Sequence, residues 1–239
     1  LKTQQEKLLL SERHEAWENV ARKLAHEIKN PLTPIQLTID RLNNKYSNLI
    51  ASDDKENFKK YLSTIIKQIK QIEALVNEFS DFARMPKPIM RKNNLVQIIQ
   101  TNIDLLKEID GDIKINFIPP NKQILVNCDN EQINRVFLNL IKNSIESIKE
   151  KISKNPDFTK KIDIEITIKN DYIIINITDN GIGFSTENLK NITKPYFTTK
   201  VKGSGLGLSI VNKIINDHNG TISFLPKKEG AKIILTLPK

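Results

Sequence analysis

Apolar residues recur along the first third of the chain at the spacing of two long amphipathic helices. In the second stretch the spacing alternates between four and three residues, an a/d heptad seam that buries a narrow stripe against partner helices. Its members are Phe58, Leu62, Ile65, Ile69, Ile72, Val76 and Phe79. A comparable upstream stripe consists of Trp17, Val20, Leu24, Ile28, Ile35, Ile39 and Leu42. Because two such helices cannot complete a core alone, the pattern predicts a helical hairpin that pairs into a homodimeric four-helix bundle.

The hydrophobic pattern changes after Met85-Pro86-Lys87-Pro88, which ends the second helix and is typical of a linker. Beyond it, helical and alternating stretches follow one another, which favours a two-layer α/β sandwich. Helices are expected over 95–109, 131–151 and 206–217, and strands over 113–118, 124–127, 162–168, 172–178, 221–225 and 232–237. We therefore expect two domains, a dimerising helical hairpin over 1–88 and an α/β domain over 89–239, with a polar turn over 43–55 inside the hairpin.

Composition narrows the possible classes of protein. The chain has 239 residues, no apolar run of membrane-spanning length and one cysteine, Cys128, which excludes a disulfide framework or a multi-cysteine zinc site. The net charge is +9, but lysine supplies 31 of the 37 basic residues and they are scattered. Proteins that bind nucleic acids usually depend on arginine and on a basic stripe, so we expect no nucleic-acid partner. Because no apolar run is long enough to span a membrane, we also expect no direct membrane contact of this fragment.

The first segment that could carry chemistry is His26-Glu27-Ile28-Lys29-Asn30-Pro31. A neutral imidazole nitrogen is nucleophilic near neutral pH, and Glu27 could accept or orient the proton on the other ring nitrogen. Asn30 follows four residues later and shares the helix face of His26. Taken alone, the segment also fits a surface histidine in a charged helix, which is the interpretation given to the chain's two other histidines.

Two polar segments of the second domain are candidates for ligand binding. Asn139 and Asn143 lie one turn apart on the helix over 131–151, and amide oxygens suit Mg²⁺ that also takes phosphate oxygens and water. Asp179, Gly181 and Gly183 follow a predicted strand directly, where glycines permit close approach and a carboxylate can accept a hydrogen bond from an exocyclic amine. Two surface asparagines and an Asn-Gly hairpin turn are the respective alternatives, and both stay open.

A glycine-rich segment, Gly203-Ser204-Gly205-Leu206-Gly207-Leu208, opens the helix over 206–217. Free backbone N–H groups at a helix N-terminus favour phosphate. The segment is neither a P-loop, because it lacks the Lys-Ser/Thr end, nor a dinucleotide fingerprint, whose third glycine comes one place later. Just before it, Tyr196-Phe197-Thr198-Thr199-Lys200 offers an apolar anchor and a cation.

Together, these segments resemble the sensor histidine kinases of two-component systems, over roughly residues 10–238. His26–Pro31 is similar to the H box of that family, Asn139–Asn143 to the N box and Asp179–Gly183 to the G1 box. Phe197 resembles the F box and Gly203–Leu208 the G2 box. The stretch over 25–35 is particularly similar to the nitrogen-regulation (NtrY/NtrB-like) type.

The resemblance implies a role for each matched residue. His26 would be the phosphoacceptor, Glu27 its acid/base partner, and Asn30 would position a water that dephosphorylates the partner regulator. Asn143, with Asn139, would hold Mg²⁺, and residues 184–202 would form a mobile ATP lid. ATP would be bound by Asn139, Asn143, Asp179, Gly181, Gly183, Phe197, Thr198, Thr199, Lys200, Gly203, Ser204, Gly205, Leu206, Gly207 and Leu208. Asp179 would accept from the adenine amino group.

Two residues depart from the family's usual pattern. Ser144 stands where alanine is more common, and Ala231 stands where threonine is more usual. Neither departure is expected to touch the chemistry.

The resemblance implies a protein-histidine kinase with a gyrase/Hsp90/histidine-kinase type of ATP-binding domain. It would autophosphorylate His26 from ATP, pass the phosphoryl group to an aspartate of a response regulator, and also act as a regulator phosphatase. Its partners would be a second copy and that regulator. We expect a cytoplasmic fragment of a bacterial inner-membrane sensor.

The sequence is also compatible with two rival functions. A gyrase-like ATP hydrolase would carry a glutamate, the base that activates water, where this chain has Asn139. A catalytically silent dimeric scaffold would bind only nucleotide or partners, but intact His26, Asn143 and Asp179 argue against it.

Overall fold

The computed structural model describes the backbone of residues 2–47, 49–50, 52–109, 111–120, 122–153, 158–200 and 203–239. Within the helices, the side chains of residues 2–19, 52–53 and 109 lie outside the description, and Trp17 of the predicted seam is among them. The chain forms two compact units, Leu1–Pro86 and Lys87–Lys239. In the part of the chain that is described, no helix is long and apolar enough to cross a membrane.

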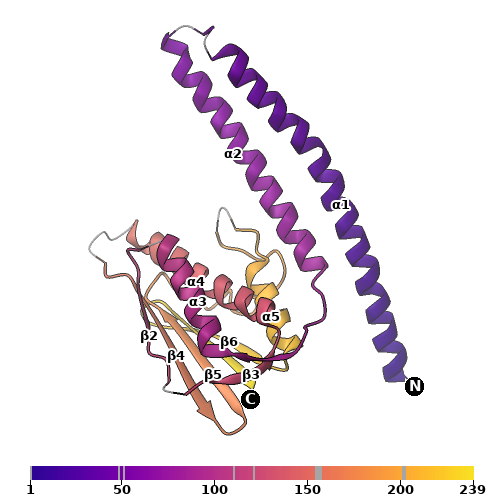
Figure 1. Ribbon diagram of the computed structural model, residues 1–239, viewed down its shortest axis with the longest axis vertical. Coiled ribbons are helices and arrows are strands. Elements are labelled where there is room, and N and C mark those ends of the chain that lie inside the picture. The colour runs from indigo at the N-terminus through magenta and orange to yellow at the C-terminus, as the bar shows by residue number, and fades with distance from the viewer. Residues whose placement is uncertain are drawn as a thin grey trace. The chain divides into compact units, whose positions relative to one another are not determined.

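The first unit is a hairpin of two long helices, α1 (Lys2–Tyr46) and α2 (Ser52–Ala83), drawn in indigo and purple in Figure 1. The polar stretch over 43–55 was predicted to be a turn, but most of it extends the two helices. Polar residues in the end turns of a helix need no apolar partner, and Ser47 continues the pattern by donating its backbone N–H to the Asn43 carbonyl (3.1 Å). Helix α1 also continues through Pro31 and Pro34.

The interior of the hairpin is narrow. Its core consists of Leu32 and Ile39 of α1 and Leu62 and Ile69 of α2, with Phe58 and Ile66 packed against them. Nearer the N-terminus of α1, before Leu32, the buried residues are small, Ala21 and Ala25. Every second member of the predicted α2 seam, Leu62, Ile69 and Val76, is buried, which agrees with one face of a heptad packing on α1.

Large apolar side chains are left at the surface of the hairpin. In α2, the alternate seam positions Ile65 and Ile72 are 44% and 42% exposed. In α1, most of the predicted seam is 38–48% exposed in the single chain, namely Val20, Leu24, Ile28, Ile35 and Leu42. Apart from Ile39, the described members of the predicted α1 stripe therefore lie outside the core of the single hairpin, whose buried α1 side chains are Ala21, Ala25, Leu32 and Ile39.

The second unit is built on a five-stranded sheet with the order β2-β4-β5-β7-β6. The strands are β2 (Lys114–Phe117), β4 (Lys161–Lys169), β5 (Tyr172–Asp179), β6 (Thr221–Pro226) and β7 (Ala231–Pro238). Only the β2–β4 pair is parallel, and the other neighbours are antiparallel. A separate two-stranded sheet pairs β1 (Arg91–Asn94) with β3 (Leu125–Cys128), and β1 was not predicted.

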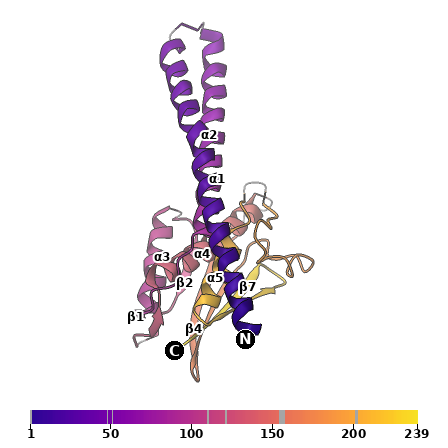
Figure 2. The same cartoon turned by 90° about the vertical axis from the view of Figure 1, so that its right-hand side faces the viewer.

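Three helices, α3 (Leu95–Ile109), α4 (Asn130–Ile152) and α5 (Gly207–Asp217), accompany the sheet (Figures 1 and 2). Alternate residues of β5 and β7 are buried, as in a sheet covered on one face. The apolar side of α4 is fully buried, including Phe137, Leu140 and Ile141. The predicted two-layer α/β sandwich is therefore confirmed.

Two polar residues connect the ends of the helices that carry the site. Asp129 caps α4 by accepting from the Gln132 N–H (3.0 Å), and it also accepts from the Ile89 N–H (2.8 Å). Burial alone would raise the pKa of Asp129, but these backbone hydrogen bonds hold it below its ordinary value. His218, buried at the end of α5, accepts from the Asp129 N–H through Nε2 (3.0 Å), while its Nδ1 lies 2.7 Å from the Ile214 carbonyl. His218 therefore has a structural role.

Candidate functional site

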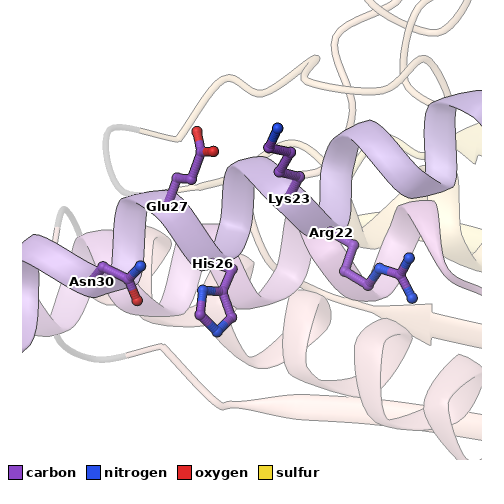
Figure 3. Close-up of a pocket in the computed structure, with 5 residues that line it drawn as sticks. All are labelled: Arg22, Lys23, His26, Glu27 and Asn30. Atoms are coloured by element: carbon purple, nitrogen blue, oxygen red, sulfur yellow. The ribbon is translucent and has the colours of Figure 1, made fainter.

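His26 lies on the exposed surface of α1, in an open hollow lined by Arg22, Lys23, His26, Glu27 and Asn30 (Figure 3). Arg22, His26 and Asn30 are spaced four residues apart, and the close-up shows them along one side of the helix. The imidazole is accessible, and two cationic side chains line the same hollow. Such a surface favours a nucleophile that meets an anionic phosphoryl group.

Glu27 and Asn30 relate to His26 in different ways. Asn30 shares the side of the helix that carries His26, whereas Glu27 projects from the opposite side with Lys23 (Figure 3). Among the side chains that the structure describes, neither Glu27 nor Asn30 makes a hydrogen bond to His26. Adjacent residues of a helix point about 100° apart, so this separation follows from helical geometry.

Asp179 ends β5 and is 4% exposed. Its carboxylate accepts from the Gly181 N–H at Oδ1 (3.0 Å) and from the Ser144 hydroxyl at Oδ2 (3.2 Å). Burial raises the pKa of Asp179, and the hydrogen bonds that the carboxylate accepts offset that rise only in part. The chain leaves β5 here without forming a second strand, so the hairpin alternative is wrong.

Ser144 and Ala231, the two departures from the family's usual pattern, both lie beside Asp179. Ser144 donates its hydroxyl to Asp179 Oδ2 (3.2 Å). Ser144 follows Asn143 on α4, and Ala231 opposes Asp179 directly in the β5–β7 pairing. Contacts between a helix and distant strands have no signature in the local sequence, which is why the spacing could not reveal them.

The remaining polar residues of the site gather along α4. Lys200 donates to Asn143 Oδ1 (3.1 Å) and forms an ion pair with Glu146 Oε2 (2.5 Å). Asn139 donates to the Arg135 carbonyl (2.8 Å), which leaves its amide oxygen directed elsewhere. A Cβ on Gly207 would lie 3.1 Å from that oxygen, so the start of α5 abuts Asn139. Asn139, Asn143, Lys200 and Gly207 are thus brought together, and Glu146 joins them without having been predicted.

The N-terminus of α5 has the properties of an anion site. Its N-cap position, Leu206, makes no side-chain cap hydrogen bond, so the first N–H groups of the helix are not capped from within. Leu206 itself is buried and offers only its backbone, while Leu208 is half-buried. Ser204 Oγ accepts from the Leu206 N–H (3.2 Å) and so shapes the loop.

The predicted lid consists of successive turns up to residue 200, with one backbone N–H donating three residues back at each of 188, 191, 194 and 197. Phe197 is half-buried, whereas Thr198 and Thr199 are exposed, and Thr198 Oγ1 accepts from the Lys200 N–H (3.1 Å). Residues 201–202 lie outside the described part of the chain.

Close packing explains the glycines of the site better than ligand approach alone. A Cβ on Gly181 would lie 2.3 Å from Ser147 Oγ and 2.7 Å from the Ser147 backbone, because the loop after β5 is drawn against α4. Gly205 has a φ of +71°, and a Cβ there would meet the backbone of Tyr196 and Phe197. Gly183 also has a positive φ, and Gly203 lies close to Thr198. The glycines therefore hold the segments of the site together.

The chemistry of the α4 side chains fits a magnesium ion. The ammonium of Lys200 lies between an amide oxygen of Asn143 and a carboxylate oxygen of Glu146, so two oxygens already stabilise a cation here. Such hard oxygen donors suit Mg²⁺. Within the described residues, no cluster of three or more His, Cys, Asp or Glu side chains could hold a metal without help, so phosphate oxygens would have to complete the coordination.

Comparison with known families agrees with this arrangement. Residues 16–88 match the His Kinase A (phospho-acceptor) domain, and residues 128–239 match the histidine kinase-, DNA gyrase B-, and HSP90-like ATPase. The chain is 39% identical over 234 residues to a protein of Rickettsia felis described as a sensor histidine kinase NtrY-like, covering 98% of this chain. The chain belongs to the sensor histidine kinases. It is of the NtrY/NtrB type, as the resemblance implied.

Other relatives and solved structures are also similar to this chain. It is 37% identical over 233 residues to the nitrogen regulation protein NtrY of Azorhizobium caulinodans, covering 96% of this chain and 30% of that protein. The chain spans 38% of the length of the Rickettsia felis relative. The histidine kinase ThkA, solved in complex with the response regulator protein TrrA, is 27% identical and similar with a TM-score of 0.67 over all of this chain and 66% of that one. ShkA in complex with AMPPNP shares the fold, with a TM-score of 0.70 over 92% of this chain and 45% of that one, at 17% identity.

Proposed function

We propose that this chain is a kinase core that phosphorylates its own His26 from ATP and passes the phosphoryl group to an aspartate of a response regulator. The observation that carries the proposal is Asp179, a buried carboxylate held as a hydrogen-bond acceptor in the same unit as an uncapped helix N-terminus. Together they offer an acceptor for the adenine amino group and donors for phosphates. The exposed imidazole of His26 supplies the nucleophile.

In the proposed reaction, an unprotonated ring nitrogen of His26 forms a bond to the γ-phosphorus, and the bond from that phosphorus to the bridging oxygen of ADP breaks. Glu27 would hold or take up the proton of the imidazole, which requires its side chain to change rotamer from the one in Figure 3. Lys200 would neutralise developing charge on the phosphates, and the N–H groups that begin α5 would bind them. Asn139 and Asn143 would hold Mg²⁺, which supplies charge neutralisation between phosphate oxygens. Because ATP is an intracellular substrate, we place this core in the cytoplasm.

The rivals predict different products from ATP labelled at the γ-phosphate. We expect label on the chain that is lost in acid and stable in base, as for a phosphorus–nitrogen bond. A hydrolase would release free phosphate with no label on the chain. A silent scaffold would bind nucleotide and give neither product. Transfer of the label to a panel of purified response regulators would then identify the partner.

We also propose that the domains divide at about residue 88, and that the hairpin over 1–88 pairs with a second copy. The support is the apolar stripe of α1 and the alternate seam positions of α2, which are about two fifths exposed in the single chain. Joining two hairpins would bury these side chains, as in a four-helix bundle.

The proposed dimer predicts the effect of introducing charges into that seam. The chain should sediment at twice its mass of 27.4 kDa. The double variant Ile65→Asp/Ile72→Asp should sediment as a monomer, because burying two carboxylates per chain costs several kcal/mol beyond the lost apolar contact. The matched control is Leu49→Asp, which changes an exposed residue outside both helices. A double variant that remains dimeric at micromolar concentration would contradict the seam assignment.

Asn30 is proposed to act in removing the phosphoryl group from the regulator. It lies one turn beyond His26 on the same side of α1, so a regulator that docks at His26 also meets Asn30 (Figure 3). A neutral amide is a poor base, but it can orient a water by donating and accepting hydrogen bonds.

The variant Asn30→Ala should therefore keep autophosphorylation and forward transfer, while phosphatase activity falls by an order of magnitude or more, as for the loss of one positioned catalytic group. The alternative is that Asn30 compensates the helix backbone near Pro31. Both rates and the melting temperature would then fall together, and a parallel loss measured on the one variant would refute the phosphatase role.

A further inference from the structure

The carboxylate of Asp179 accepts hydrogen bonds from two different parts of its unit. Oδ1 accepts from the Gly181 N–H in the loop after β5, and Oδ2 accepts from the Ser144 hydroxyl on α4. Of these two donors, only Ser144 is a side chain, and it is 2% exposed, so its hydroxyl is committed to this contact. The orientation of the carboxylate thus depends on one hydroxyl that the sequence could vary.

The residue opposite Asp179 has no hydroxyl. Ala231 is its partner in the antiparallel β5–β7 pair, so the two side chains lie on the same face of the sheet, and both are buried there. Cβ atoms of such opposed residues are about 4.5–5.5 Å apart. A threonine or serine at position 231 could therefore reach the same carboxylate. In this chain the hydroxyl is on the helix at Ser144 and is absent from the strand at Ala231.

We propose that Ser144 is a positioning residue that holds Asp179 as a pure hydrogen-bond acceptor and thereby sets the preference for ATP over GTP. The inference rests on the proposed function, in which Asp179 receives the adenine amino group. It gives the nucleotide site a determinant of base specificity that lies beside the proposed magnesium-binding Asn143 on α4.

The difference between the two bases gives the physical reason. Adenine presents an amino donor at the ring position where guanine presents a carbonyl acceptor. An ionised carboxylate offers acceptors only, so it pairs with adenine and leaves the guanine carbonyl facing a negative oxygen. Donation from Ser144 stabilises the ionised form and fixes its plane. Without it, burial would favour protonation, and a protonated carboxyl can donate to guanine.

The test measures ATP and GTP dissociation constants of the whole chain by calorimetry. Ser144→Ala should weaken ATP about tenfold, the lower range for a hydrogen bond to a charged group, while GTP binding changes little. The ratio of the two constants should therefore fall about tenfold. The double variant Ser144→Ala/Ala231→Thr should restore the ratio to within about threefold, because the new hydroxyl couples to the same carboxylate. Ala231→Ser replaces Ala231→Thr if the melting temperature shows that threonine is too large.

Ser209→Ala is the matched control. Ser209 is as well buried as Ser144, but its hydroxyl donates to the Leu206 carbonyl (2.8 Å) and not to Asp179, so its loss should leave the ATP/GTP ratio unchanged. An unchanged ratio in Ser144→Ala, or equal weakening of both nucleotides with a lower melting temperature, would overturn the inference. If Ser144→Ala leaves the ratio unchanged while Asp179→Asn abolishes ATP binding, the proposed function stands and only the role of Ser144 is refuted. A wild-type chain that binds neither nucleotide would overturn both.

Discussion

The variant His26→Gln should lose all acid-labile label from ATP and still bind ATP with wild-type affinity. Glutamine keeps a polar side chain on an exposed helix position, so α1 should remain folded. It lacks a nucleophilic nitrogen, because the lone pair of an amide nitrogen is delocalised into the carbonyl. The proposed nucleotide site lies in the other unit, on residues that this substitution does not touch. The loss should therefore be complete for transfer and absent for binding.

The controls separate loss of the nucleophile from damage to the helix. Arg41→Gln makes the same replacement at another exposed position of α1 and should keep full labelling. Circular dichroism and sedimentation of both variants should match the wild type. Acid-labile label retained by His26→Gln would move the phosphoacceptor to another residue and refute the assignment of His26.

The sequence predicted the regular elements well where apolar periodicity was strong. Helix α3 has the predicted bounds, and the long strands β4, β5 and β7 lie within one or two residues of the expected ranges. Strand β1 was missed because Arg91-Lys92-Asn93-Asn94 contains no apolar residue. It exists through its pairing with β3, a contact between segments more than thirty residues apart. Tertiary pairing can override local propensity in this way.

The site was predictable as a set of residue types but not as a set of contacts. Asn139, Asn143, Lys200 and Gly207 stand out by spacing, and the structure places them together. Glu146 resembled any surface glutamate until its ion pair with Lys200 was seen. Ser144 resembled a harmless replacement until its hydroxyl was found on Asp179. In each case the information is carried by a helix, strand or loop that is distant in sequence.

The variant Asp179→Asn should weaken ATP binding by at least about a hundredfold, because a donor amide group replaces an acceptor inside a buried site. The fold should survive, since the side chains are nearly the same size. Burial raises the pKa of Asp179, so the ionised carboxylate costs the native state free energy near neutral pH. A neutral amide removes that cost. The melting temperature should therefore stay within a few degrees of the wild type.

The same pKa predicts how ATP binding depends on pH. Because the pKa of Asp179 is raised, the carboxylate gains its proton at a higher pH than an ordinary aspartate, and wild-type ATP binding should weaken as pH falls through that pKa. Protonation of ATP itself affects all variants alike. The loss of ATP affinity that comes from protonation of Asp179 should be absent from Asp179→Asn. It should be present in the control Asp171→Asn, which changes an exposed aspartate at the other end of β5. Parallel pH profiles for the wild type and Asp179→Asn, with similar affinities at neutral pH, would show that the adenine base is bound without Asp179.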